Sequence, residues 1–139
     1  MESTSGIVLV VEDDAALLEA MRRGLSAAHF DVLAAYDYQT AVAQLQNPRI
    51  DFICIDLGLP NESGYELCER VRQEPALCFV PIVVTDERGF PEDMARAEDA
   101  GANAFLKKPF SMELLSDCLD MLTVGGAQSR PPIRRLRWA

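Results

Sequence analysis

The segment FICIDLGLPNESG, residues 52–64, joins a short apolar run to a carboxylate and then to a turn-forming polar stretch. The run FICI, residues 52–55, has the length and composition of a buried β-strand. The strand ends at Asp56, and burying an unpaired carboxylate costs several kcal/mol. An acid at this position therefore needs either a partner or a chemical function.

The same alternation of apolar runs and amphipathic segments extends to both sides of residues 52–64. Apolar runs predict strands at 7–11, 31–35, 52–55, 81–85 and 103–106. Apolar residues at helical spacing predict helices near 17–25, 37–46, 67–71, 91–100 and 114–122. Five β-α units with nearly continuous apolar strands predict an α/β fold in which helices cover both faces of a parallel sheet. Right-handed crossovers favour a doubly wound, five-stranded sheet.

Length and composition indicate one globular domain, because 139 residues of which 49% are hydrophobic can form a single core. The apolar stretch Ile7–Val11 is too short to cross a membrane or to form the core of a signal peptide, and residues 1–6 carry no positive charge, so we expect a cytoplasmic protein. The four cysteines form no C-x-x-C pair, and all four are expected to be core residues: Cys54, Cys68, Cys78 and Cys118.

Charge divides the chain into two parts, a domain at 1–122 and a Gly/Pro/Arg-rich tail at 123–139. The net charge is −9, but residues 123–139 hold four arginines and no acid, which leaves 9 basic and 22 acidic residues in 1–122. So acidic a domain is a poor partner for nucleic acid or an anionic membrane. The tail is either a linker to an output domain or a short arm that contacts nucleic acid or an acidic partner.

Chemically active side chains follow four of the five predicted strands. These residues are Glu12, Asp13 and Asp14 after the first strand, Asp56 after the third, Thr85 at the end of the fourth, and Lys107 and Lys108 after the fifth. Ligands of doubly wound sheets bind at the carboxyl ends of the strands, so these groups are expected to converge. Clustered carboxylates favour a hard cation such as Mg²⁺, and a carboxylate beside Mg²⁺ and a lysine can attack phosphorus. The pattern predicts that Asp56 accepts a phosphoryl group.

Four motifs at these strand ends resemble one known family. VVEDDA (10–15), CIDLGLPNESG (54–64), IVVT (82–85) and FLKKPF (105–110) resemble the response-regulator receiver domains of bacterial two-component systems, over about residues 6–122. The resemblance implies a three-layer, flavodoxin-like fold with strand order 2-1-3-4-5. It also implies a signalling switch that catalyses only its own phosphorylation and dephosphorylation, not an enzyme.

The resemblance assigns a role to each matching position. Asp56 is the expected phosphoacceptor, and Lys108 is expected to bind the phosphoryl oxygens. Mg²⁺ is expected to bind Asp13, Asp56 and the backbone carbonyl of Gly58, with Glu12 acting through water. Asp14 is not expected to be a direct ligand.

Thr85 and Phe105 are the expected switch residues. Thr85 is expected to move toward the phosphoryl group while the ring of Phe105 turns inward, which alters the surface of the fourth helix, fifth strand and fifth helix. A cis peptide is expected between Lys108 and Pro109. The phosphoryl group is expected from a sensor histidine kinase or a histidine phosphotransfer protein, and the switched surface is expected to control an output domain or a downstream protein.

Two features depart from the family pattern. Asp86 stands where the family usually has a small residue, and we expect its carboxylate to narrow access to the site or to repel the phosphoryl group. The last predicted helix, SMELLSDCLDML, lacks the basic residues of the helix-four/helix-five dimer of the transcription-factor subfamily, so that dimer is not expected.

Three other functions fit the same fold. A flavodoxin-type FMN carrier needs a phosphate-cradling first loop, whereas this chain has EDDAA at residues 12–16. An aspartyl-phosphate phosphatase usually has a D-x-D motif, and Gly58 replaces the second acid. The main alternative is a pseudo-receiver, a protein-binding module of this fold that acts without phosphorylation.

Overall fold

A parallel sheet forms the centre of the molecule in the computed structural model, which describes residues 4–124 and 134–135. The sheet order is β2-β1-β3-β4-β5-β6, and every neighbouring pair is parallel. The strands are β1 (Gly6–Val11), β2 (Phe30–Ala35), β3 (Phe52–Asp56), β4 (Ile82–Asp86), β5 (Ala104–Lys107) and β6 (Arg134–Arg135). The five predicted strands and their order 2-1-3-4-5 are confirmed.

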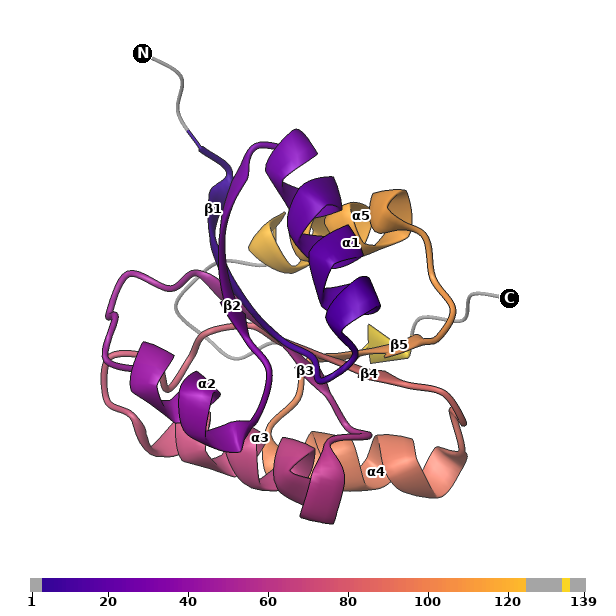
Figure 1. Ribbon diagram of the computed structural model, residues 1–139. Helices are drawn as coiled ribbons and strands as arrows, with labels where there is room; N and C mark the ends of the chain where they lie inside the picture. The colour runs from indigo at the N-terminus through magenta and orange to yellow at the C-terminus, as the bar shows by residue number, and fades with distance from the viewer. Residues whose placement is uncertain (1–3, 125–133, 136–139) are drawn as a thin grey trace.

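Five α-helices connect or follow these strands and form the two outer layers. They are α1 (Ala15–Ala27), α2 (Tyr38–Gln44), α3 (Ser63–Gln73), α4 (Pro91–Ala100) and α5 (Met112–Val124), and a 3₁₀ turn at Pro60–Glu62 precedes α3. Figure 1 shows α1 and α5 on one face of the sheet and α2, α3 and α4 on the other. The predicted doubly wound, three-layer fold is therefore confirmed.

Each face of the sheet has its own apolar core, which explains why the strands are apolar at nearly every position. In β1, Leu9 and Val11 pack on the side of α2, α3 and α4, whereas Val8 and Val10 pack on the side of α1 and α5. Residues next to each other in a strand point to opposite faces, so a strand covered on both sides has no polar face. Cys54, Cys68 and Cys118 are buried in these cores as predicted, and Cys78 is partly exposed.

Helix ends follow the capping residues that the sequence contains. Asp37 accepts a hydrogen bond from the backbone N–H of Thr40 at 2.8 Å and forms a capping box at the start of α2. The hydroxyl of Ser111 accepts one from Leu114 N–H at 3.0 Å at the start of α5. Gly101 ends α4 in a left-handed conformation, with φ of 113°.

The sixth strand was not predicted. The backbone of Arg134 and Arg135 pairs with Ala104 and Phe105 at the open edge of β5 (Figure 1). Two residues in a Gly/Pro/Arg-rich stretch carry no apolar alternation, so backbone pairing leaves no signal in the sequence. The other predictions for the 123–139 tail, a linker or a binding arm, concern residues that lie mainly outside the described part. Within that part, no helix is long and apolar enough to cross a membrane.

Candidate functional site

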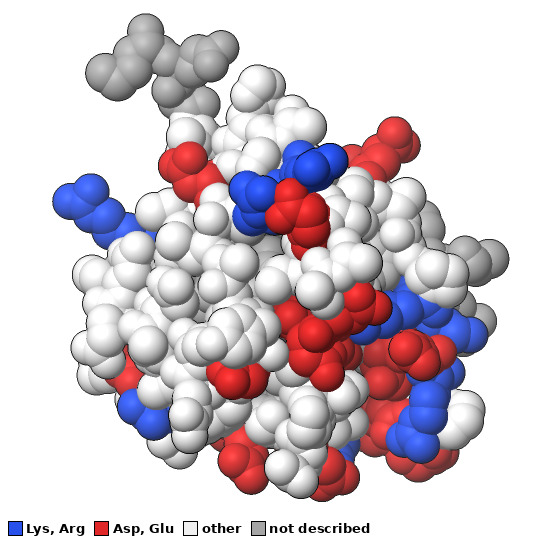
Figure 2. Space-filling model, viewed as in Figure 1, with Lys and Arg blue, Asp and Glu red and all other residues white. Residues whose placement is uncertain are grey.

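The carboxyl ends of β1, β3, β4 and β5 surround a cavity of about 510 Å³. Eight of the residues that line it are acidic and three are basic: Glu12, Asp13, Asp14, Asp56, Glu62, Asp86, Glu87 and Asp93, with Arg88, Arg96 and Lys108. Figure 2 shows a cluster of carboxylates from the centre to the lower right of this face, with basic side chains beside it on the right. The predicted acids and Lys108 therefore lie around one cavity.

Three of the acids are close enough to bind one cation together. Each of these acids has one carboxylate oxygen that lies within 4.8 Å of the corresponding oxygens of the other two; the acids are Glu12, Asp13 and Asp56. Glu12 and Asp56 are buried, whereas Asp13 is exposed. Three carboxylates at this separation repel one another, and an all-oxygen donor set open to solvent on one side suits Mg²⁺. The donor chemistry fits the predicted magnesium ion.

Lys108 is the cation that contacts this acidic cluster. Its Nζ lies 2.8 Å from Glu12 Oε1 and 3.4 Å from Asp56 Oδ2. Burial acts to lower the pKa of Lys108, but its hydrogen bond to Glu12 and the charge of Asp56 outweigh burial, so the pKa is raised. Burial raises the pKa of Glu12 to about 7, although its hydrogen bonds to Lys108 and to the backbone of Asp14 act in the opposite direction. Lys107, one residue earlier, is exposed.

Two glycines lie against Asp56, Gly58 in the loop after β3 and Gly64 in the first turn of α3. The backbone N–H of Gly58 donates a hydrogen bond to Asp56 Oδ1 at 2.8 Å, which holds one carboxylate oxygen in place. A Cβ at Gly64 would lie 2.5 Å from the carbonyl oxygen of Asp56 and 2.9 Å from the Cα of Leu57. Only a residue without a side chain lets α3 begin this close to the end of β3.

Thr85 and Phe105, the two residues predicted to act as switches, lie in the neighbouring strands β4 and β5. Thr85 is in register with Asp56 in the neighbouring strand, and its side chain is buried. Phe105 lies one strand farther along, paired with Val84, and is fully buried on the side of the sheet that α4 covers. The peptide between Lys108 and Pro109 is cis, as predicted.

Asp14 and Asp86 line the cavity but engage their own backbone. Asp14 caps α1, because its Oδ1 accepts hydrogen bonds from Ala16 at 3.0 Å and Leu17 at 3.2 Å. Asp86 Oδ2 faces the backbone N–H groups of Arg88 at 3.2 Å and Gly89 at 3.4 Å, which turns the carboxylate toward its own loop. The prediction that Asp86 narrows or repels access remains a prediction.

Sequence reasoning missed a group of side chains on the α4 side of the cavity. Arg96 in α4 makes two hydrogen bonds of 2.9 Å to the carboxylate of Glu62 and lies 3.9 Å above the ring of Tyr65. Arg88 makes a similar double contact with Asp93, at 2.8 and 2.9 Å. Glu62 and Arg96 are 34 residues apart, so no local spacing could reveal their pairing.

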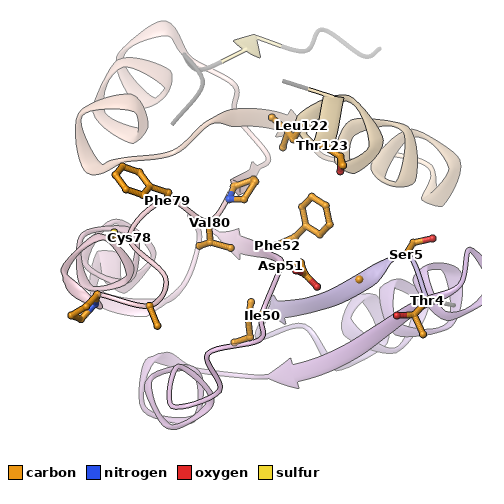
Figure 3. Close-up of a pocket in the computed structure, with 14 residues that line it drawn as sticks. Thr4, Ser5, Ile50, Asp51, Phe52, Cys78, Phe79, Val80, Leu122 and Thr123 are labelled. Atoms are coloured by element: carbon orange, nitrogen blue, oxygen red, sulfur yellow. The ribbon is translucent and has the colours of Figure 1, made fainter. Parts of the chain in front are cut away.

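A second, larger cavity of about 640 Å³ lies at the opposite end of the sheet. Figure 3 shows Phe52 and Asp51 at the start of β3 facing this space, with Phe79 and Val80 from the segment before β4 and Leu122 and Thr123 from α5. Among the described residues that line it, Asp51 is the one charged residue. None of the predicted site residues contributes to this cavity, so size alone does not identify the chemical site.

Comparison with known sequences shows one family. Residues 8–120 match the response regulator receiver domain family. The chain is 36% identical over 104 residues to the phosphate regulon transcriptional regulatory protein PhoB of Escherichia coli, covering 75% of this chain and 45% of that protein. It is 32% identical over 129 residues to the transcriptional regulatory protein TcrA of Mycobacterium tuberculosis, covering 92% and 50%. The chain thus spans about half the length of these curated relatives.

Solved structures show the same architecture. The chemotaxis response regulator CheY4 of Vibrio cholerae superposes with a TM-score of 0.79 at 30% sequence identity, covering 85% of this chain and 98% of that one. The signal receiver domain of a signal transduction histidine kinase from Syntrophus aciditrophicus gives a TM-score of 0.78 at 26% identity, covering 90% and 95%. Both similarities extend over nearly the whole sheet and its helices.

Proposed function

This chain belongs to the response regulator receiver domain family, and we propose that it accepts a phosphoryl group on Asp56 in a two-component signalling system. The observation that supports this most strongly is the position of Asp56. Its carboxylate lies at the end of a buried strand, with Lys108 Nζ 3.4 Å away and oxygens of Glu12 and Asp13 within 4.8 Å. A carboxylate nucleophile with this many charged neighbours is equipped for phosphoryl transfer.

In the proposed reaction, one carboxylate oxygen of Asp56 attacks the phosphorus of the donor and displaces the donor's leaving group. Asp13, Asp56 and the carbonyl of Gly58 would hold Mg²⁺, with Glu12 acting through water. That ion, when bound, supplies positive charge at the transferring phosphoryl oxygens. Lys108 would exchange its contact with Asp56 for a phosphoryl oxygen, because the aspartyl carboxylate loses its negative charge when it becomes part of a mixed anhydride with the phosphoryl group.

Switching in this proposal starts at Thr85 and ends at the surface of α4, β5 and α5. The hydroxyl of Thr85, next to Asp56 in the neighbouring strand, would bind the phosphoryl group, and the ring of Phe105, which is already fully buried here, would be held in its inward position. To shift most molecules from the inactive to the active state, phosphorylation must stabilise the active state by several kcal/mol relative to the inactive one. Charge-assisted hydrogen bonds to a phosphoryl group can supply this difference.

The proposed donor is a phosphohistidine on a sensor histidine kinase or a histidine phosphotransfer protein, and the proposed location is the cytoplasm. Receiver domains are a family of signalling switches and not classical enzymes. Two relatives, of which this chain covers 45% and 50%, are named as transcriptional regulatory proteins, which supports an output domain or downstream protein as the target. The receiver would then comprise residues 1–122, and the tail at 123–139 would lead to the output.

Intact-protein mass spectrometry after incubation with acetyl phosphate tests this proposal. We expect wild-type protein to gain one phosphoryl mass only when Mg²⁺ is present, and Asp56→Asn to gain none. Asp99→Asn provides a matched control, since Asp99 is an exposed acid of α4 that does not line the cavity. If wild-type protein gains no mass in Mg²⁺, the proposal fails and the pseudo-receiver becomes the better description.

A further inference from the structure

A phosphoryl donor that approaches Asp56 meets a cavity that is lined mainly by acids. The three basic residues of the lining differ in how far their ion pairs are exposed to water. Lys108 forms ion pairs with Glu12 and Asp56 inside the cavity, and its side chain is only 13% exposed. Arg88 is itself 61% exposed, but its partner Asp93 is only 13% exposed. Arg96 is 51% exposed and its partner Glu62 is 66% exposed. Water therefore competes most strongly for the Glu62–Arg96 pair.

The ring of Tyr65 keeps Arg96 beside the cavity even when the ion pair opens. The guanidinium carbon lies 3.9 Å from the ring centroid, and the ring is nearly buried. Stacking on an aromatic face leaves the N–H groups at the guanidinium edge free to point outward. Tyr65 lines the same cavity as Asp56, so a guanidinium that leaves Glu62 stays at the mouth.

The backbone at Glu62 indicates that the pairing is not an incidental surface contact. Asn61 and Glu62 both have left-handed backbone conformations, with φ of 61° and 58°. Asparagine tolerates this region, but for glutamate it is unfavourable and requires support from the surrounding structure. The strained position directs the Glu62 carboxylate from the Asp56 loop toward α4, where Arg96 binds it with both nitrogens.

We infer that Arg96 is a substrate-binding residue, which leaves Glu62 to bind the phosphoryl group of the incoming donor at the cavity mouth. The inference rests on the proposed phosphorylation of Asp56. A planar guanidinium with several parallel N–H donors matches a phosphoryl group, as it matches the Glu62 carboxylate that it binds beforehand. Glu62 thus competes with the donor for Arg96. An exposed ion pair is weak, so this exchange is readily reversible.

Removing either member of the pair should change phosphoryl uptake in opposite directions, which a purely structural tie would not do. The experiment measures the second-order rate constant for phosphorylation of Asp56 by acetyl phosphate in Mg²⁺. We expect Arg96→Gln to be about fivefold slower and Glu62→Gln about threefold faster, in line with the strength of exposed pairs. Arg96→Lys, which keeps the charge without the planar fork, should fall between wild type and Arg96→Gln.

Arg22→Gln is the matched control. Arg22 makes the same kind of double contact, with Glu19 on α1, at 3.0 and 2.7 Å, and does not line the cavity. Its rate should equal that of wild type. At about 1 M salt, where screening acts over ~3 Å, the differences at Arg96 and Glu62 should shrink. Thermal unfolding checks that each variant is folded. If Arg96→Gln does not fold, the rate of Glu62→Gln relative to wild type still tests the inference.

If Arg96→Gln and Glu62→Gln slow phosphorylation of Asp56 equally, the inference is overturned and the pair has only a structural role. Wild-type rates in both variants would overturn it as well. Each of these results requires that wild-type protein is phosphorylated on Asp56, so each leaves the proposed function intact. If wild-type protein takes up no phosphoryl group at all, the proposed function fails and the inference fails with it.

Discussion

Glu12 shows how a single residue links burial to the chemistry of the site. Its carboxylate is 1% exposed and lies 2.8 Å from Lys108, yet its pKa is raised to about 7. Burial disfavours the charged form more than one lysine and one backbone N–H can offset. Near neutral pH, the charge of the acidic cluster therefore depends on the proton of Glu12.

This raised pKa predicts a pH dependence of stability in the absence of Mg²⁺. The folded-state pKa of about 7 exceeds the ordinary value of 4.5, so the folded protein binds more protons between these values and its stability falls as pH rises through 7. The free energy of unfolding from urea titrations should drop by up to ~3 kcal/mol between about pH 5 and pH 8. Glu12→Gln should remove most of this slope, and an equal slope in the variant would contradict the assignment.

At the scale of elements, the junction between β3 and α3 sets the position of Asp56. Leu57 N–H donates to the carbonyl of Thr85 at 2.9 Å, which extends the pairing of β3 and β4 one residue past Asp56. The chain then turns through Pro60–Glu62 into α3. Because α3 begins against the backbone of Asp56, packing of this helix and orientation of the carboxylate are coupled.

Gly64→Ala tests that coupling. The added Cβ would lie 2.5 Å from the carbonyl oxygen of Asp56, a backbone atom that cannot rotate away, so we expect a loss of about 2 kcal/mol despite the better helix propensity of alanine. Phosphorylation by acetyl phosphate should slow as well, because the carboxylate moves with its backbone. Chemical denaturation and mass spectrometry measure the two effects.

Gly58→Ala is the comparison for this variant. Its Cβ would lie 3.1 Å from Asp56 Oδ1, a side-chain atom that can shift, so the loss of stability should be smaller than for Gly64→Ala. If Gly64→Ala is as stable as wild type, the close approach of α3 to Asp56 is not required.

The elements that could be predicted are those whose own residues carry the pattern. β1 was expected at 7–11 and spans Gly6–Val11, and β5 was expected at 103–106 and spans Ala104–Lys107. Continuous apolar runs and strand-end polar residues made these visible, as they did for Asp56 and Lys108. β6 and the Glu62–Arg96 pair were missed, because one depends on backbone pairing alone and the other joins segments that only the folded chain brings together.

At the scale of the whole molecule, the parallel sheet separates two ends of different character. All strands run in the same direction, so the acids, Thr85 and Lys108 that end them gather at one side. The opposite side holds the larger cavity, where Asp51 is the single charged residue among the described residues of the lining. Repulsion within the acidic end opposes folding, and a bound divalent cation relieves it. Stability of the whole domain should therefore respond to Mg²⁺.

Mg²⁺ should raise the melting temperature in a concentration-dependent way, because an ion that binds only the folded state stabilises it by mass action. At about 100 times the dissociation constant, this increment is ~2.7 kcal/mol. Asp13→Asn should lose most of the increment, because Asp13 offers one of the three clustered carboxylate oxygens. Calorimetry with Mg²⁺ and with EDTA measures the increment directly.

Asp14→Asn separates metal binding from a general effect of charge, since it removes the same charge one residue away. Asp14 uses its carboxylate to cap α1, and asparagine is also a good capping residue, so this variant should keep nearly the full Mg²⁺ increment. Asp14→Ala should lower the melting temperature by losing about 1 kcal/mol of capping, equally with Mg²⁺ and with EDTA. If Asp14→Asn and Asp13→Asn lose the same share of the increment, Mg²⁺ responds only to the overall negative charge of this end of the sheet, and Asp13 has no special role as a ligand.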